Sequence, residues 1–319
     1  MTNQTTTVHY IGVDVAAAKL DLAANHLTDL PKQVRNQAAA IKQWLRSLPP
    51  TAHLICESSG PYHKVLLRAC WQLGVTVSLV NPERVRALAK ANGQHAKTDR
   101  LDAQLLVEFG AQQQPKPTSP PDPIRDRLQE LNTRRLQLLA HRIQELNRQQ
   151  QPALDKAVAA SIRRLRKFLD GEIARLEAQA DQLIAQSPAL TAQVAELTKV
   201  VGVGPQTAKA LLATIPELGA VSRQRIAGLA GLAPFPCESG QWQGHRRIRG
   251  GRSAVRQALY MAALTAMYHN SHLKTFAQRL TANGKPHHLV ITAVMRKLLV
   301  HLNALIAKHQ DANQALKKS

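Results

Sequence analysis

The sequence predicts an α/β domain followed by a mostly helical region. Short apolar segments alternate with helical segments over the first 110 residues, which is typical of a layered sheet with at least partly parallel strands. Residues 111–121 then contain four prolines and three glutamines, the composition of a stiff linker. From residue 122 onward apolar residues recur with the period of a helix. We therefore expect four parts: 1–110, the linker 111–121, a coiled-coil-like hairpin at 122–190 and a C-terminal domain at 191–319.

The N-terminal part reads as a meander that continues into strand–helix alternation. Neighbouring early strands predict antiparallel pairing, and the later strands are each separated by a helix. Asn81-Pro82 is a typical helix start, with Asn as cap and Pro in the first position. The expected strands are 8–15, 19–25, 33–37, 53–56 and 75–80, and the expected helices are 38–47, 61–73, one from 82 and one opening at 97–103.

Two long antiparallel helices are expected between residues 122 and 190, with a break near 150–152. From Ile162 to Leu183 the apolar residues are spaced three or four apart, which is a heptad-like stripe. This hairpin could pack on its own domain, mediate oligomerisation or clasp nucleic acid. The arginines available for the last role are Arg134, Arg135, Arg142, Arg163, Arg164 and Arg166.

Residues 197–212 have the pattern of a helix, a Gly-x-Gly turn and a second helix. A helix-hairpin-helix-like motif of this kind offers backbone amides to a phosphate, and Gly202, Gly204 and Lys209 are the residues that would serve it. An ordinary corner between two helices also uses glycines, so both readings stay open. Further helices are expected at about 225–234, 253–268 and 287–308, the last ending the fold.

The stretch from Cys237 to Arg252 has no helix or strand period, and its glycines predict a loop. It places one hydroxyl, on Ser239, among several arginines. A nucleophile beside cations is what a loop that handles a phosphodiester needs, although a plain phosphate clamp has the same composition. The cations that could position a nucleic-acid strand here are Arg246, Arg247, Arg249, Arg252 and Arg256.

The net charge of the chain is +21, and most of this excess lies in the last third. Residues 199–319 contain 17 Lys and Arg but only three Asp and Glu. This distribution predicts a polyanionic partner, most plausibly nucleic acid. We expect no membrane-spanning segment and no leader peptide, and three cysteines without metal spacing fit a reducing cytosol.

Four carboxylates form a candidate metal site. Asp14 and Glu57 lie at the ends of apolar strands, where α/β sheets place their sites. Asp99 and Asp102 are three residues apart in a first helical turn and so share a face. Each acid could instead be a cap or a turn residue. Taken together they are an oxygen-only set, which suits Mg²⁺ or Mn²⁺.

These motifs resemble the DEDD transposases of bacterial insertion sequences, the "one-ten" family also known as bridge-RNA-guided recombinases. The N-terminal resemblance rests on Gly12-Val13-Asp14, Glu57-Ser58-Ser59-Gly60-Pro61-Tyr62, Asn81-Pro82 and Lys97-Thr98-Asp99-Arg100-Leu101-Asp102-Ala103. The C-terminal resemblance rests on Gly231-Leu232-Ala233-Pro234, Ser239-Gly240, Arg246-Arg247-Ile248, Gly250-Gly251-Arg252 and Arg256-Gln257-Ala258-Leu259-Tyr260. It covers nearly the whole chain outside the linker and the hairpin.

The resemblance implies a fold and an activity. The first domain would be RuvC-like, a ribonuclease-H-like fold, with a divalent metal, normally Mg²⁺, at Asp14, Glu57, Asp99 and Asp102. Ser239 would be the nucleophile that forms a phosphoserine link to DNA. The resemblance further implies double-stranded donor and target DNA, a non-coding guide (bridge) RNA, a homo-tetramer, and a bacterial cytoplasmic, nucleoid-associated location.

Two other functions fit the residues. A RuvC-like, metal-dependent structure-specific endonuclease would use activated water, with Ser239 only a clamp residue. A non-catalytic nucleic-acid-binding protein would need neither the acids nor the serine. A covalent protein–DNA adduct would distinguish the recombinase from the endonuclease, because hydrolysis by water leaves none.

Overall fold

The computed structural model divides the chain into two compact units, Met1–Pro121 and Asp122–Ser319. It describes residues 8–27, 29–58, 60–93, 99–239 and 242–316. Within these ranges the side chains of residues 99–100, 236–246 and 313–316 lie outside the description. Each unit has its own hydrophobic core.

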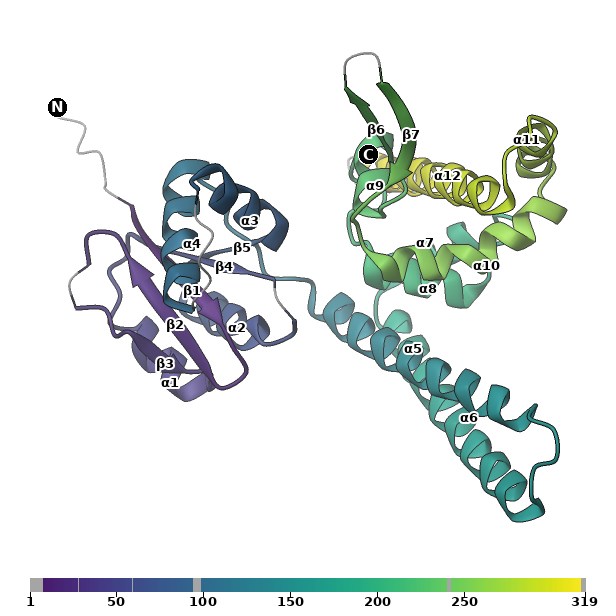
Figure 1. The fold of residues 1–319 in the computed structure, drawn as a ribbon, viewed down its shortest axis with the longest axis horizontal. Helices are drawn as coiled ribbons and strands as arrows, with labels where there is room; N and C mark the ends of the chain where they lie inside the picture. Colours follow the sequence, from purple (N-terminus) through teal and green to yellow (C-terminus); the bar gives the residue numbers. More distant parts are fainter. Residues whose placement is uncertain (1–7, 28, 59, 94–98, 240–241, 317–319) are drawn as a thin grey trace. The chain divides into compact units, whose positions relative to one another are not determined.

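The first unit contains one five-stranded sheet, in the order β3-β2-β1-β4-β5 (Figure 1). Strands β1, β2 and β3 form the antiparallel meander, while β4 and β5 run parallel to β1. The α/β class expected from the sequence is confirmed. The strand bounds are β1 (His9–Val15), β2 (Lys19–Ala24), β3 (Gln33–Arg35), β4 (Ala52–Glu57) and β5 (Thr76–Val80).

Helices cover both faces of this sheet. One face packs on α1 (Ala38–Leu45) and α2 (His63–Leu73) through a core that includes Ile11 and Val13. The other face packs on α3 (Pro82–Ala91) and α4 (Asp99–Gln113) through Ile55, Leu106 and Phe109 (Figure 1). The side chains of each strand alternate between the two cores because successive residues point to opposite faces.

The expected linker is partly docked on the first unit. After α4 the chain runs along strand β5, where the Thr118 backbone N–H donates to the Val77 carbonyl at 2.8 Å. The Thr118 hydroxyl accepts from the Leu79 backbone N–H, and the Trp71 indole donates to the Thr118 carbonyl. Ser78 Oγ donates to the carbonyls of Pro115 and Lys116. Residues 115–118 therefore behave as an anchored edge segment of the sheet rather than as a free tether.

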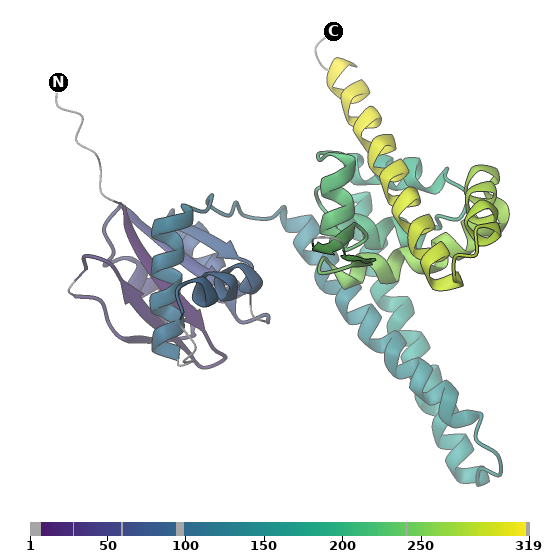
Figure 2. The ribbon, with the colours of Figure 1, turned by 45° about the horizontal axis from the view of Figure 1, so that its top comes forward.

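The second unit begins with two long helices, α5 (Pro123–Gln149) and α6 (Lys156–Ala185). They lie side by side and antiparallel, because Arg135 pairs with Glu177 and Arg142 pairs with Asp170 (Figure 2). Leu138, Leu169 and Ile173 form a small core between them. The helical hairpin expected from the heptad-like stripe is present, and its break falls within three residues of the expected one.

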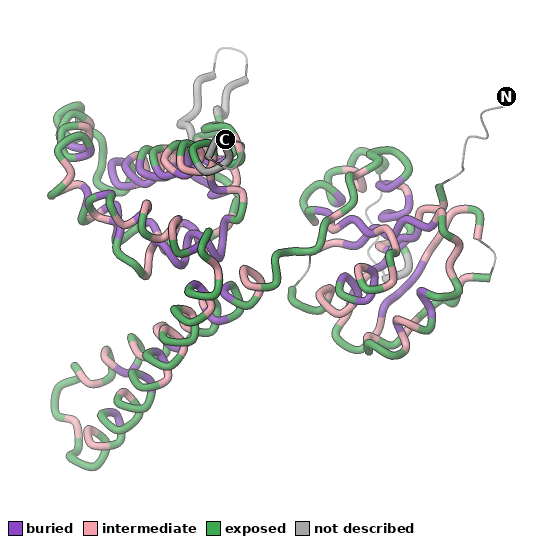
Figure 3. Tube along the Cα trace, turned by 180° about the vertical axis from the view of Figure 1, so that it is seen from behind, coloured by how far each residue is buried: buried purple, intermediate pink, exposed green. Residues whose placement is uncertain are grey.

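The rest of the second unit is a helical domain with one large core, which is visible as buried stretches on α10 and α12 in Figure 3. The sequence missed one helix, α11, although Asn270 caps it and Leu273 and Ala277 bury its inner face. The helices and the hairpin strands are α7 (Pro188–Thr198), α8 (Pro205–Thr214), α9 (Arg223–Leu229), β6 (Pro234–Ser239), β7 (Trp242–Ile248), α10 (Ser253–His269), α11 (Ser271–Ala282) and α12 (His287–Leu316).

Helix α12 corrects the expectation that no apolar run could span a bilayer. Within His287–Ala312 a window of 18 residues has a mean hydropathy of 1.7, which is long and apolar enough to do so by length and composition. Half of that window is buried inside the protein, and Val294, Leu298 and Leu302 belong to the large core. The packing explains the composition: α12 is apolar because it is the central helix of this domain.

Candidate functional site

Asp14 and Glu57 are neighbours at the carboxyl ends of two parallel strands. Strand β1 pairs with β4 in a register that ends at Val13 opposite Cys56, so each acid is the next residue along its strand. Adjacent strands lie about 4.8 Å apart, and residues in register point to the same face. The two carboxylates therefore share one face and one end of the sheet, as the sequence predicted for strand-end acids. Both side chains are only partly exposed.

Gly12 allows helix α4 to lie directly on this face. A Cβ at Gly12 would stand 1.9 Å from the Ala103 carbonyl oxygen and 2.9 Å from the Val107 nitrogen. Further along α4, a Cβ at Gly110 would meet Tyr10 and Ile55. The N-terminal end of α4 therefore lies toward the carboxyl ends of β1 and β4. Asp14 and Glu57 lie on the α4 side because they follow Gly12 and Ile55 by two residues on their strands.

The first turn of α4 brings the other two acids to the same corner. Asp102 precedes Ala103, the residue that contacts Gly12, and Asp99 begins the helix. A helix rises 1.5 Å per residue and a strand about 3.3 Å, so four residues back along α4 covers about the same distance as two residues along β1. Along the axis of α4 the backbone of Asp99 is thus about level with Asp14, and that of Asp102 lies between the levels of Gly12 and Val13. The Asp102 side chain is partly buried, and the side chain of Asp99 lies outside the described residues.

The chemistry of this corner suits a divalent cation. Its four candidate ligands are all carboxylates, the donor type that Mg²⁺ and Mn²⁺ prefer. Among the described side chains, which exclude Asp99, no group of three or more Asp, Glu, His or Cys residues is close enough to hold a metal ion. The fit therefore rests on backbone placement and donor chemistry.

A fifth acid, Asp21, lies directly opposite Asp14 on strand β2. Asp21 is buried, and its carboxylate accepts from the Gln33 amide at 2.6 Å and pairs with the Lys19 ammonium at 2.9 Å. Gln33 lies on the neighbouring strand β3, whereas Lys19 belongs to β2 itself, and the contact of Oδ2 with Lys19 is an ion pair without hydrogen-bond geometry. The position of Asp21 on the same face as Asp14 follows from strand alternation and could have been found from the sequence.

Ser239 lies at the tip of a β-hairpin, which corrects the prediction of a loop without strands. Strands β6 and β7 pair antiparallel, with Ser239 opposite Trp242 as the last pair before the turn. A shift of register between Phe235 and Cys237 interrupts the alternation, and this irregularity explains why the sequence shows no strand period. The side chains of Cys237, Glu238, Ser239 and Arg246 lie outside the described residues.

The base of this hairpin is clamped by two glycine segments that touch. A Cβ at Gly231 would stand 2.1 Å from the Gly250 carbonyl oxygen, and one at Gly251 would stand 2.0 Å from the Gly231 nitrogen. Both residues have φ near +70°, which other residues rarely adopt. The Arg252 backbone N–H donates to the Leu229 carbonyl at 2.8 Å. The two ends of the hairpin are thereby fixed to each other and to the end of α9.

Two of the expected DNA-contacting arginines brace this clamp. Arg252 donates from both terminal nitrogens to the Glu217 carboxylate, at 2.6 and 2.7 Å. Burial by itself raises the pKa of Glu217, but the hydrogen bonds and charge of Arg252 outweigh it and lower that pKa. Arg256 donates to the carbonyls of Ala230 and Gly250. Arg247 and Arg249 are exposed, so they are the described cations of this stretch that face solvent.

The turn between α7 and α8 has the expected course. Gly202, with φ of +101°, packs against α10, where a Cβ would meet the Ala262 carbonyl and Ala266. Gly204 is the exposed N-cap of α8 and has open space around it. Lys209 is buried and pairs with Asp181 of α6 at 2.7 Å. Its described contact is therefore structural, and Gly204 is the residue of this turn that leaves backbone amides open to a partner.

The fold and this distribution of acids and cations are those of an enzyme that acts on DNA. Residues 11–159 match the DEDD transposase family of IS110, and residues 194–278 match the transposase family IS116/IS110/IS902. The chain therefore belongs to the IS110 family of DEDD transposases and is a DNA transposase or recombinase. The first match spans most of the α/β unit and helix α5, and it ends at the start of α6; the second spans the segment with Ser239.

Curated relatives agree with this assignment over the full length. The pilin gene-inverting protein of Moraxella lacunata is 30% identical over 320 residues, covering 96% of this chain and 98% of the relative. The pilin gene-inverting protein of Moraxella bovis is 30% identical over 318 residues with the same coverage. The IS900 42 kDa protein of Mycobacterium paratuberculosis is 34% identical over 104 residues, which is 32% of this chain and 26% of that protein.

Proposed function

We propose that the protein is an RNA-guided, site-specific DNA recombinase of an insertion sequence that cleaves and rejoins DNA through a phosphoserine at Ser239. The observation that carries the proposal is the corner of the α/β unit. There Asp14 and Glu57 follow paired strands in register, and the first turn of α4 adds Asp99 and Asp102. A carboxylate corner of this kind suits metal-assisted chemistry on a phosphodiester.

In this mechanism the Ser239 hydroxyl attacks the phosphorus of the scissile phosphodiester. A bond forms between Oγ and phosphorus while the bond from phosphorus to one deoxyribose oxygen breaks, and the serine proton ends on that leaving oxygen. The phosphoserine keeps the energy of the broken bond, so the hydroxyl of another strand can reverse the step and release Ser239. Arg247 and Arg249, exposed at and beyond the end of β7, would hold the phosphates of the strand.

A divalent cation, Mg²⁺ or Mn²⁺, held by Asp14, Glu57, Asp99 and Asp102 would stabilise negative charge on the phosphate oxygens and favour ionisation of a nearby hydroxyl. The chain's own contribution is to keep four like charges together. Without a cation such carboxylates repel and take up protons. Removal of divalent ions with a chelator should therefore abolish strand transfer and leave the fold intact.

The decisive experiment traps the intermediate. The protein is incubated with Mg²⁺, DNA carrying the ends of its own insertion sequence and any RNA that co-purifies, then denatured and digested for mass spectrometry. We expect a nucleotide adduct on Ser239 in the wild type and none in Ser239→Ala. An active wild type without an adduct, or strand cleavage by Ser239→Ala, would favour the water-using endonuclease instead.

RNA guidance is the part of the proposal that rests on family membership. A guide RNA paired with donor and target DNA would read sequence, while exposed cations hold the shape of the duplex. Sequencing of RNA that co-purifies with the protein should recover a structured transcript from DNA flanking the gene. Its loops should be complementary to the insertion junctions, and RNase treatment should abolish site choice.

We further propose that helices α5 and α6 mediate assembly into a homo-tetramer. The hairpin's Arg135 and Arg142 are engaged with acids of the facing helix. Its exposed side chains instead include large apolar ones, namely Ile143, Val158, Leu165 and Phe168, which is 58% exposed. Phe168→Glu should lower the oligomeric state measured by analytical ultracentrifugation, whereas Lys167→Ala at the next position should not.

Assembly also allows an active site shared between subunits, with the serine of one copy and the acids of another. Mixing Ser239→Ala with Glu57→Gln tests this. Recovery of activity in mixed oligomers is expected, because one pairing then combines an intact serine with intact acids. Lack of recovery at every mixing ratio would mean that each subunit uses its own two halves.

A further inference from the structure

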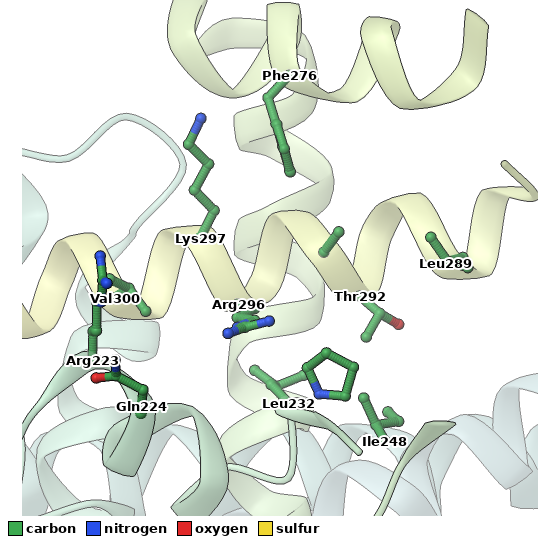
Figure 4. A pocket seen from close by; sticks show the side chains of 12 residues that line it. Arg223, Gln224, Leu232, Ile248, Phe276, Leu289, Thr292, Arg296, Lys297 and Val300 are labelled. Atoms are coloured by element: carbon green, nitrogen blue, oxygen red, sulfur yellow. The ribbon is translucent and has the colours of Figure 1, made fainter. Parts of the chain in front are cut away.

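A pocket of about 620 Å³ lies at the root of the hairpin that carries Ser239. Its walls come from four places: the start of α9, the root of β6 and β7, α11 and α12 (Figure 4). Pro234 and Ile248, the first pair of the hairpin, belong to the wall. The volume is within the range of pockets that hold small organic groups.

The floor of the pocket is apolar and open to solvent. Leu232, Leu289, Ala293 and Val300 line it together with the hairpin root, and Leu289 and Ile248 are 40% and 42% exposed. In Figure 4, Arg296 and Thr292 project from α12 on the side where Leu232 and Ile248 lie. An apolar pocket of this volume that is open to solvent favours an apolar group such as the face of a flat ring.

The rim of the pocket is cationic. Arg223, Arg296 and Lys297 line it, and Lys297 Nζ lies 4.4 Å from the centre of the Phe276 ring, which holds the ammonium at the wall. No acidic residue is among the lining residues that the structure describes. Of the three acids after residue 198, Glu217 is paired with Arg252, and Asp311 lies 14 residues beyond Lys297, about 21 Å along α12. The third, Glu238, belongs to β6, and its side chain lies outside the described residues.

An apolar slot with a cationic rim complements a nucleotide, whose base is flat and apolar on its faces and whose phosphate is anionic. A peptide from another copy of this chain would leave the three cations without partners. The position of the pocket selects the kind of nucleic acid. Strand β6 leads from Pro234 in the wall to Ser239 at the tip, five residues or roughly 16 Å away.

We propose that this pocket holds one unstacked base of the DNA strand that Ser239 cleaves, with its phosphate on Arg223, Arg296 and Lys297. A distance of roughly 16 Å corresponds to about five nucleotides at 3.4 Å each, and to fewer if the strand is extended. The pocket would hold the strand in register on the hairpin. The inference rests on the proposed role of Ser239, and its test below needs no cleavage.

The test compares two probes that share a backbone. The full-length protein, in a chelating buffer that prevents cleavage, is titrated by fluorescence anisotropy with a labelled twelve-nucleotide oligothymidylate and with an abasic oligodeoxynucleotide of equal length. One base held in the slot should make the oligothymidylate bind about 10-fold more tightly. The ratio of the two affinities, oligothymidylate over abasic probe, is the quantity of interest. Equal affinities in the wild type, a ratio of one, would overturn the proposal.

Variants assign the effect to the pocket. Ala293→Phe should fill the slot. The ratio of the affinity for oligothymidylate to the affinity for the abasic probe should then fall to about one, while the affinity for the abasic probe stays unchanged. Arg296→Gln should weaken both probes and reduce the slope of log affinity against log salt by about one. Lys308→Gln, on the same helix but outside the pocket, should keep the ratio. A folded Ala293→Phe protein that keeps the wild-type ratio would overturn the proposal.

Leu289→Glu gives a second route if Ala293→Phe does not fold, because the Leu289 side chain in the floor of the pocket is 40% exposed and a charge there stays solvated. It should reduce the affinity for both probes, and unchanged affinities would contradict the proposal. The same comparison can be made with an oligouridylate and an abasic RNA of equal length. If only the RNA probes differed in affinity, the pocket would bind RNA, and the DNA assignment would be overturned. Ser239→Ala should keep the full ratio, so failure of the pocket and failure of the nucleophile are separate results.

Discussion

The two halves of the proposed active site are held in different ways. The carboxylates lie at the end of a five-stranded sheet that is packed on both faces, and strand register positions Asp14 beside Glu57. Ser239 lies at the end of a two-stranded ribbon whose fixed point is its base. A two-stranded hairpin has little stability of its own, so the position of the serine depends on the clamp.

This difference explains where the arginines of the hairpin segment are used. The acid corner needs no salt bridges to stay in register, because the sheet and Gly12 define it. The hairpin base needs Arg252 on Glu217 and Arg256 on two carbonyls. Cations that look like DNA contacts in the sequence therefore serve as braces, and the exposed Arg247 and Arg249 are left for the partner.

The largest effect should come from removing one carboxylate. Asp14→Asn or Glu57→Gln should lower strand transfer by about 10³-fold or more, because a metal-assisted step loses several kcal/mol when the ion is lost. Circular dichroism and the melting temperature should stay close to wild type, since the sheet remains. Full activity in either variant would mean that the corner is not catalytic. Glu108→Gln, also on α4, is the matched control.

Gly12→Ala should separate packing from chemistry at the same corner. Its Cβ would be 1.9 Å from the Ala103 carbonyl, a backbone atom, so α4 must move. We expect a loss of about 3 kcal/mol or more in the free energy of unfolding of the α/β unit, measured by urea denaturation. Gly74→Ala, at a helix end with open space around it, should cost less despite its positive φ.

Gly251→Ala makes the corresponding change in the hairpin clamp. The added Cβ would meet the Gly231 backbone at 2.0 Å in a conformation that already disfavours alanine. A destabilisation of about 2 to 4 kcal/mol is expected, with loss of strand transfer, while the α/β unit is unaffected. Hydrogen exchange should show faster exchange in β6 and β7 only. If the amides of β6 and β7 were as protected from hydrogen exchange as in the wild type, the contact between Gly231 and Gly251 would not be what holds the hairpin.

The Glu217–Arg252 pair should give a smaller, pH-dependent effect. The pKa of Glu217 is lowered in the folded protein, so the pair stabilises the fold above the ordinary pKa of a glutamate and loses this contribution as pH falls through the lowered value. Glu217→Gln should therefore reduce the melting temperature at pH 7 by a few degrees and flatten its dependence on pH below about 4. If the melting temperature of Glu217→Gln depended on pH below about 4 in the same way as that of the wild type, the stabilising role of the Glu217–Arg252 ion pair would be contradicted.

The smallest effect is expected for the exposed arginines. Arg249→Gln should leave stability unchanged and weaken binding to duplex DNA only a few-fold at moderate salt. The slope of log affinity against log salt should fall by about one. Arg252→Gln should instead lower stability with little change in that slope. If Arg252→Gln reduced the salt slope and Arg249→Gln reduced stability, Arg252 would be the DNA contact and Arg249 the structural residue.

The sequence by itself determined most of the fold and the identity of the candidate acids. Apolar periodicity predicts the strands, the helical hairpin and the strand-end positions of Asp14 and Glu57, because these depend on local alternation. The net positive charge of residues 199–319 likewise predicts a polyanionic partner. Local pattern was insufficient at α11 and at the hairpin, where polar residues and a shift of register hide the period.

Only the tertiary structure decided which charged residues are free to act. Lys209, Arg252 and Arg256 look alike in sequence to Arg247 and Arg249, yet the first three are engaged by partners at least six residues and as many as 38 away. The pocket beneath the hairpin joins residues from α9 to α12 and has no motif. A charge's partner and a cavity's walls are set by contacts between distant segments, which no local pattern encodes.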